Sequence, residues 1–172
     1  MEKINAVISL TNGKKINLEL YPSVAPISVA NFVKLANEGY YNGLCFHRVI
    51  PGFMVQGGGM AAQGGQLVQK GGCTPIKGEF SQNGVVNNLK HTKGVLSMAR
   101  TNVPNSATSQ FFICVADCQS LDGAYAAFGK TADDESFKVA EEISRVPTCN
   151  VGYHGDVPRQ AVVIESITVM AP

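Results

Sequence analysis

The segment FHRVIPGFMVQGG, residues 46–58, indicates two short strands joined by a turn. Pro51 and Gly52 suit the turn, because proline presets a negative φ and glycine tolerates a positive one. Alternation groups the side chains that share a side of each strand: Phe46, Arg48 and Ile50; His47 and Val49; Met54 and Gln56. Arg and Gln are seldom placed on buried strands without a partner. The pattern alone favours an Arg that faces solvent from an ordinary alternating strand.

Further strands and two helices surround this segment. Residues 4–10 and 16–20 alternate on either side of Asn12-Gly13, which is a strong hairpin pattern. Residues 26–38 and 133–145 repeat their apolar side chains at helical spacing. Short apolar or β-branched segments predict the other strands: 45–50, 53–56, 95–99, 110–115, 126–130 and 161–169. Because the strands come in uninterrupted blocks, we expect a mostly β fold, a closed eight-stranded antiparallel β-barrel capped by two α-helices.

The composition limits the possible classes of protein. The chain has 172 residues, with 14 Lys and Arg against 13 Asp and Glu, so its formal charge is +1. We expect a single domain over residues 1–172 that binds neither nucleic acid nor membrane, because those partners attract strongly basic chains. The five cysteines form no CxxC pair, the sequence has no long apolar run, and we expect no signal peptide. These features predict a soluble, cytoplasmic protein, with a monomer as the default.

A glycine-rich window covers residues 57–78 and holds eight of the 18 glycines. It lacks the Gly-Lys-Ser/Thr ending of a phosphate-binding loop. The window therefore predicts a long surface loop, in which glycine lets the backbone turn tightly or approach a ligand.

Standard catalytic sets are poorly represented. His47, His91 and His154 lack the spacing of a zinc site, and we expect no metal and no cofactor. Cys149 and His154 could form a nucleophile and base, but residues 147–154 are predicted to be a loop and no third group is identifiable.

Several motifs occur in a fixed order: FHRVIPGFMVQGG at 46–58, GVLSMA at 94–99, SQFFI at 109–113 and LDG at 121–123. Together they closely resemble the cyclophilin family of peptidyl-prolyl cis-trans isomerases. The agreement covers nearly the whole chain, and the sequence resembles compact single-domain bacterial members of the family. The resemblance implies an eight-stranded barrel with two helices. It also implies an enzyme that accelerates rotation about Xaa-Pro peptide bonds and assists protein folding, acting on proline-containing peptides and on unfolded or native proteins.

The resemblance implies roles for a first group of residues. Arg48 matches the family's catalytic arginine. The pocket that receives the substrate proline ring is matched by four apolar residues: Phe53, Met54, Phe112 and Leu121. Rotation about Xaa-Pro crosses a barrier of about 18–20 kcal/mol, because it breaks amide resonance. No covalent bond is exchanged, so a positioned hydrogen-bond donor and a ring pocket suffice, and a guanidinium suits the donor role.

A second group is implied to hold the rest of the substrate. Gln56 and Gln110 match polar groups that bind its backbone, and Ala99 and Arg100 match the segment that pairs with it as an extended strand. Tyr125 stands where many relatives have His and where bacterial members often have Tyr.

Two departures from the family pattern carry expectations. Many relatives have a Trp before Leu-Asp-Gly that contributes to cyclosporin binding, whereas Ser120 stands here and the chain has no Trp. We therefore expect weak cyclosporin binding with catalysis retained. Arg100 replaces an Asn that is common in relatives, and its charge is expected to favour acidic residues near the substrate proline.

Two other functions are compatible with the same residues. A binding module would capture proline-containing segments without turnover, although such a module has no need of an Arg aimed at the amide. A barrel that stacks single-stranded nucleic acid on Phe and Arg would require a basic surface, and a charge of +1 makes this unfavourable.

Overall fold

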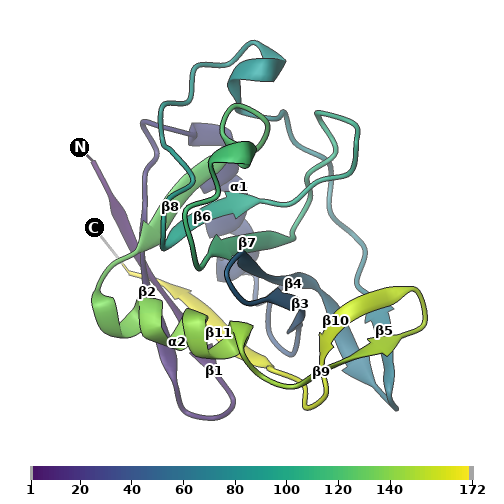
Figure 1. Ribbon diagram of the computed structural model, residues 1–172. Helices are drawn as coiled ribbons and strands as arrows, with labels where there is room; N and C mark the ends of the chain where they lie inside the picture. The colour runs from purple at the N-terminus through teal and green to yellow at the C-terminus, as the bar shows by residue number, and fades with distance from the viewer. Residues whose placement is uncertain (1, 171–172) are drawn as a thin grey trace.

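The computed structural model describes residues 2–170 (Figure 1). One antiparallel sheet is built from nine strands: β1 (Ile4–Leu10), β2 (Lys15–Leu20), β3 (Cys45–Ile50), β4 (Met54–Gln63), β5 (Gln66–Gln69), β6 (Val95–Met98), β7 (Phe111–Cys114), β8 (Ala127–Thr131) and β11 (Ile164–Val169). Eight of them follow the order β11-β1-β2-β8-β6-β7-β4-β3, and β5 pairs with β4 beside this path. The predicted mostly β fold is confirmed.

The two ends of this strand order meet over a short stretch. The N–H of Ile164 donates to the carbonyl of Leu44 (2.7 Å), and the N–H of Phe46 donates to the carbonyl of Val162 (3.0 Å). A continuous ladder between β3 and β11 does not form, because the rest of β3 lies against β10 (His154–Pro158). The sheet therefore curls into a barrel that is only partly closed, and the prediction of a closed barrel was overstated.

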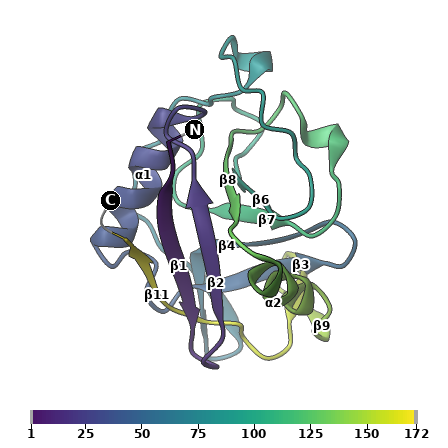
Figure 2. The ribbon, with the colours of Figure 1, turned by 90° about the vertical axis from the view of Figure 1, so that its left-hand side faces the viewer.

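The two predicted helices are present, each within a residue or so of its expected ends. They are α1 (Pro26–Asn37) and α2 (Asp134–Ser144), and Figure 2 shows α1 beside β1 and β11 with α2 on the far side of β2. The Glu79 carboxylate accepts hydrogen bonds from the N–H groups of Ile27 and Ser28 at the start of α1. These contacts satisfy amides that a helix start leaves unpaired.

Aromatic rings join α1 to the sheet inside the barrel. Phe32 of α1 is fully buried, and its ring lies 5.4 to 5.5 Å from the rings of Tyr41, Phe111 and Phe128. This contact anchors β7 and β8 to the helix from within. The outer face of β7 is thereby left free for a second, smaller apolar cluster, which consists of Met54, Phe112, Cys114 and Cys118.

A bulge in β3 changes which side chains share a face. The register of β3 against β4 shifts between Phe46 and Arg48, so Phe46 and Val49 both lie in the interior while Arg48 is exposed. The prediction that Phe46, Arg48 and Ile50 share one side was therefore wrong for Phe46. A bulge inserts one residue into the strand, and alternation read from sequence continues through it.

Two short hairpins were missed. β9 (Thr148–Val151) and β10 form a separate two-stranded sheet, although residues 147–154 were expected to be a loop. The glycine-rich window is also not one loop, since its first part extends β4 to Gln63 and β5 follows the turn at Gly64-Gly65. The remaining elements are two 3-10 turns, η1 (Ser81–Asn83) and η2 (Gln119–Leu121). Within residues 2–170, no helix is long and apolar enough to span a membrane.

Candidate active site

The site lies on the outer face of β3, β4 and β7. Strand pairing places Arg48 opposite Gln56, and Gln56 opposite Phe112, so the three residues form a row across the sheet. Arg48 stands at the exposed end, and Phe112 at the buried end is only 4% exposed. The row therefore runs from a free cation to an apolar surface within the width of three strands.

A pocket of about 160 Å³ opens over this row. Nine of the ten residues expected at the site line it: Arg48, Phe53, Met54, Gln56, Ala99, Arg100, Phe112, Leu121 and Tyr125. The tenth, Gln110, lies next to it and accepts a hydrogen bond from the side-chain amide of Gln56 (2.9 Å). The structure thus brings together residues from four separate stretches of the chain.

Phe112 forms the apolar base of the pocket, and two aromatic rings hold it. The ring of Tyr125 meets it edge-on at 5.7 Å, and the ring of His91 stacks on it at 6.0 Å with an interplanar angle of 19°. Both arrangements are favourable for aromatic pairs. The pocket base therefore has a fixed orientation that its own strand would not impose.

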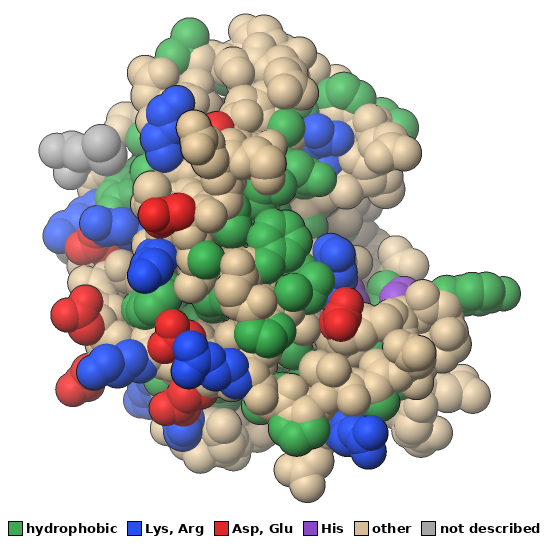
Figure 3. Space-filling view, viewed as in Figure 1, with side chains coloured by type: hydrophobic (Ala, Val, Ile, Leu, Met, Phe, Trp, Pro, Cys, Tyr) green, Lys and Arg blue, Asp and Glu red, His purple; other side chains and the backbone are tan. Residues whose placement is uncertain are grey.

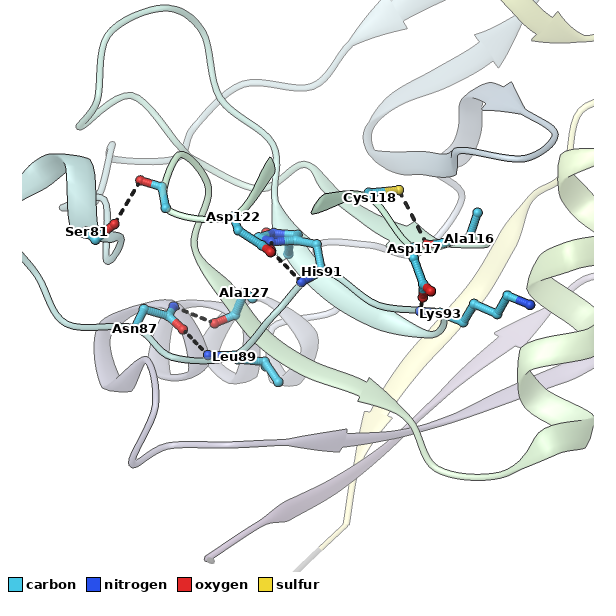
Figure 4. A network of polar contacts seen from close by, with 12 residues as sticks. Ser81, Asn87, Leu89, His91, Lys93, Ala116, Asp117, Cys118, Asp122 and Ala127 are labelled. Carbon is cyan, nitrogen blue, oxygen red and sulfur yellow. Dashed lines mark hydrogen bonds and ion pairs between the residues drawn. The ribbon is translucent and has the colours of Figure 1, made fainter. Parts of the chain in front are cut away.

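His91 is itself held by a buried polar network (Figure 4). Its Nδ1 lies 3.0 Å from the Asp122 carboxylate and its Nε2 lies 2.9 Å from the Ser97 hydroxyl. Burial lowers the pKa of His91, against the opposing effect of Asp122. Burial also raises the pKa of Asp122, but hydrogen bonds from the backbone N–H and ring of His91 outweigh it, so this pKa is lowered overall.

Arg100 is held inward by its own neighbours. Its guanidinium donates to the carbonyl of Ala124 from Nε (3.0 Å) and Nη2 (2.6 Å), and to the carbonyl of Thr101 from Nη1 (2.8 Å). The same group lies over the rings of Phe80 (4.7 Å) and Tyr125 (4.8 Å). Arg100 thus fastens one wall of the pocket as well as lining it.

Glycine in β4 is required for close packing behind the pocket. A Cβ on Gly59 would lie 2.3 Å from the Gln110 side chain. Gly58 has a φ of +89°, and a Cβ there would lie 2.7 Å from the ring of Phe111. These two glycines let β4 approach β7, so part of the glycine excess serves a strand and not a surface loop.

Other nucleophile and metal chemistry has little support. Burial raises the pKa of Cys114 well above its ordinary value, and it also raises that of Cys118, which keeps both thiols protonated. Cys149 lies on β9 opposite Val157 of β10, whereas His154 lies opposite Val151, so strand pairing does not set the two residues against each other. Among residues 2–170 there is no cluster of three or more His, Cys, Asp or Glu side chains suited to a metal ion.

Sequence reasoning missed the residues that support the pocket. His91, Ser97 and Asp122 were not chosen, and neither was Phe80 beneath Arg100. Asp122 lies inside the Leu-Asp-Gly motif and Ser97 lies inside GVLSMA, so these two motifs were the available signals. His91 and Phe80 lie outside the motifs and in other segments than Phe112 and Arg100, which they contact, so only the fold brings these pairs together.

Comparison with known proteins places this geometry in a family. The model of the cyclophilin type peptidyl-prolyl cis-trans isomerase/CLD family matches residues 6–169. Peptidyl-prolyl cis-trans isomerase A of Dickeya dadantii is 45% identical over 95% of this chain and 84% of its own length. Peptidyl-prolyl cis-trans isomerase B of Escherichia coli is 42% identical over 92% of this chain and 96% of its own length.

Solved structures agree with the sequence comparison. A cyclophilin type peptidyl-prolyl cis-trans isomerase of Cryptosporidium parvum superposes with a TM-score of 0.78 at 28% identity, covering 99% of both chains. A structure of that protein in the presence of the dipeptide Ala-Pro superposes with a TM-score of 0.76 at 28% identity, covering 98% of this chain and 99% of the other. The matched family model, the bacterial relatives and the shared fold all lead to one conclusion: this chain belongs to the cyclophilin type peptidyl-prolyl cis-trans isomerases.

Proposed function

We propose that the pocket isomerises Xaa-Pro bonds with Arg48 as the hydrogen-bond donor and Phe112, Met54, Phe53 and Leu121 as the proline-ring site. The observation that carries this assignment is the row from Arg48 to Phe112. It sets a guanidinium without an intramolecular partner in the described structure beside a preformed apolar pocket. A ring held against Phe112 would place its amide toward the guanidinium.

The chemistry of rotation explains this division of roles. In the twisted amide the nitrogen becomes pyramidal and its lone pair accepts a hydrogen bond, which a planar amide nitrogen does not do. A donor that is already oriented stabilises this state more than the planar ground state, and only such a difference accelerates the reaction. The apolar pocket fixes the ring so that the other side of the bond rotates.

Neighbouring groups are proposed to hold the substrate backbone. The side-chain amide of Gln56 donates a hydrogen bond to the Oε1 of Gln110, which leaves the Oε1 of Gln56 and the Nε2 of Gln110 for a peptide. The N–H of Ala99 already donates to the carbonyl of Gln110 (3.0 Å), so its carbonyl is the group proposed to pair with the substrate. Tyr125 packs against Phe112 and closes the wall beside Arg100.

The physiological partners are proposed to be proline-containing peptides and protein clients whose folding rate is limited by cis-trans isomerisation of an Xaa-Pro bond. We further propose that the protein acts as a cytoplasmic monomer of one domain, residues 1–172, that binds no nucleic acid. The five cysteines, all free, favour a reducing compartment, and one large apolar core shared by the sheet and both helices favours a single domain. The formal charge of +1 disfavours nucleic acid.

Exchange spectroscopy on an Xaa-Pro peptide tests the catalytic assignment. At a small molar fraction of protein, we expect exchange broadening between the cis and trans signals, because turnover interconverts them faster than the uncatalysed rate of tens to hundreds of seconds. Shifted signals without exchange would identify a binding module instead and would contradict the proposal.

Weak cyclosporin binding is a further expected result. Ser120 lies in η2 and is exposed, and it offers neither the large apolar surface nor the indole donor of a Trp. Titration calorimetry should therefore give a Kd far weaker than nanomolar for the wild-type chain, and Ser120→Trp should tighten it. A nanomolar Kd for the wild-type chain would contradict this prediction.

Replacing Arg100 should weaken substrate binding more than turnover. Arg100→Asn removes the stacking on Phe80 and Tyr125 and the bonds to the loop carbonyls, so we expect KM to rise about three- to tenfold with kcat little changed. A steady-state assay over a range of peptide concentrations measures both constants. Arg100→Lys keeps the positive charge but lacks the planar guanidinium with its several donors, so it should resemble Arg100→Asn.

The alternative role of Arg100 is attraction of acidic substrates by its charge. In that case Arg100→Lys would keep a preference for acidic peptides and a KM near that of the wild type. An unchanged KM in both variants would contradict the positioning role.

A further inference from the structure

A second cleft adjoins the proline pocket on the side of the β9–β10 hairpin. It has a volume of about 370 Å³ and shares Arg48 and Gln56 with the pocket. Residues 153–156 of the hairpin line it together with His47, whose ring lies 6.2 Å from that of His154. Figure 3 shows the surface hollowed on its right-hand side above the hairpin, where histidine side chains lie near a basic and an acidic side chain. A chain bound in the pocket could continue into this cleft without leaving the surface.

Several polar side chains at this cleft make no hydrogen bond or ion pair within the described residues. His47 is only 4% exposed, and its buried Nδ1 has no hydrogen-bond partner among the described residues. Across residues 2–170, no ion pair or side-chain hydrogen bond includes Arg48, His154 or Asp156. Buried polar atoms are nearly always paired in folded proteins. Arg48 and Asp156 are exposed, so their charged groups are open to a polar ligand in the cleft, whereas the Nδ1 of His47 is enclosed.

The hairpin backbone is shaped to present its side chains to the cleft. The register of β9 and β10 shifts between His154 and Val157, which leaves Gly155 and Asp156 outside the ladder. Asp156 has a φ of +58° and is the one non-glycine residue with positive φ in the described chain. Strained residues and bulges cluster at functional sites, where they redirect side chains. The bulge takes Asp156 out of the ladder at the cleft that it lines.

The charge of the hairpin side indicates what the cleft would bind. Asp156 carries the one formal negative charge of residues 153–156. Tyr153, which also lines the cleft, presents a fully exposed aromatic ring. Burial, together with the nearby His154 and Arg48, lowers the pKa of His47 to about 4, so this ring is neutral at physiological pH. Arg48 lies at the border with the proline pocket, where its donors face the substrate amide in the proposed function. A carboxylate next to an open aromatic ring is a favourable site for an ammonium or guanidinium group.

We infer that the cleft is a second substrate subsite, in which Asp156 and Tyr153 bind the side chain of a Lys or Arg a short distance along the chain from the substrate proline. The inference rests on the proposed function, because the proline pocket positions the chain that enters the cleft. It adds a sequence preference that the proline pocket by itself does not have.

A peptide series tests the subsite. Each peptide has the same Xaa-Pro bond and carries Lys, Gln or Glu at one of three positions on either side of it, and kcat/KM is measured by exchange spectroscopy. We expect Lys to exceed Gln by about fivefold at one position and Glu to fall below Gln there. In Asp156→Asn the ratio of Lys to Gln should fall to near one. Asn tolerates the positive φ at this position, so the backbone is kept.

A matched control separates local from general charge. Asp134→Asn removes the same charge from an exposed position of α2 that lines neither cavity, and it should keep the wild-type ratio. Tyr153→Ser, which alters a fully exposed side chain, should lower the ratio in part.

Three outcomes would overturn the subsite: no preference for Lys at any position, a preference that persists in Asp156→Asn, or one lost equally in Asp134→Asn. Failure of the proposed function is distinguishable, because it would abolish exchange on the Gln peptides of the wild-type chain as well.

Discussion

Arg48→Ala should lower kcat/KM for an Xaa-Pro peptide by about 10²- to 10³-fold, the usual effect of removing one oriented donor from a transition state. Arg48 is exposed and makes no intramolecular side-chain hydrogen bond within the described residues, so its loss should leave the fold unchanged. The ring site of Phe112 and Met54 would remain, and KM should change much less than kcat. A protease-coupled proline-isomerisation assay measures the effect.

The conservative variant sharpens this test. Arg48→Lys keeps a positive charge but replaces the planar fork with a compact ammonium, so its activity should lie between those of the wild type and Arg48→Ala. Far-ultraviolet circular dichroism checks that each variant is folded. Wild-type turnover in a folded Arg48→Ala protein would show that the guanidinium is not the donor.

Acidification should destabilise the protein through His47. Its folded-state pKa is lowered to about 4, mainly by burial and further by His154 and Arg48, whereas the ordinary value is 6.5. Above pH 6.5 both the folded and the unfolded states hold the neutral ring, and His47 contributes nothing. Below it, the unfolded state binds a proton that the folded state does not, so the free energy of unfolding falls. This contribution reaches about 3 kcal/mol at pH 4.

Urea denaturation from pH 7 to pH 4 measures this dependence, and His47→Gln isolates it. Gln does not titrate, so the unfolding free energy of the variant should fall less over the same range, whatever its stability at pH 7. His91 acts in the same direction because its pKa is also lowered, and it remains in both proteins. Parallel pH curves for the wild type and His47→Gln would contradict the prediction.

The candidate site could be assembled from sequence because its members lie in ordered motifs. Arg48, Met54 and Gln56 sit on two adjoining strands, and alternation with strand pairing carries Gln56 to Phe112. Alternation did not predict which side chains share the face of β3 with Arg48, because it does not reveal the bulge before that residue. The arrangement of the pocket thus followed from motifs, while its supporting contacts did not.

The contacts that hold the Arg100 side chain inward could not be predicted from its own segment of the sequence. Its charge suggested a group that reaches for substrate, whereas Phe80, Ala124 and Tyr125 surround it in the fold. The stacking of His91 on Phe112 is a similar case, since the two residues belong to different segments. Such contacts depend on the relative position of whole elements, and short-range patterns carry no information about it.

The sequence by itself determined the family, the mostly β fold, both helices and nine of the residues that line the pocket, because these depend on local periodicity and on motifs of fixed spacing. Only the tertiary structure decided how far the barrel closes, which way Phe46 points, and what stands behind and beside the pocket. The β9–β10 hairpin is the clearest case. Its strands are short and irregular, and their position against β3 comes from packing between segments about 100 residues apart.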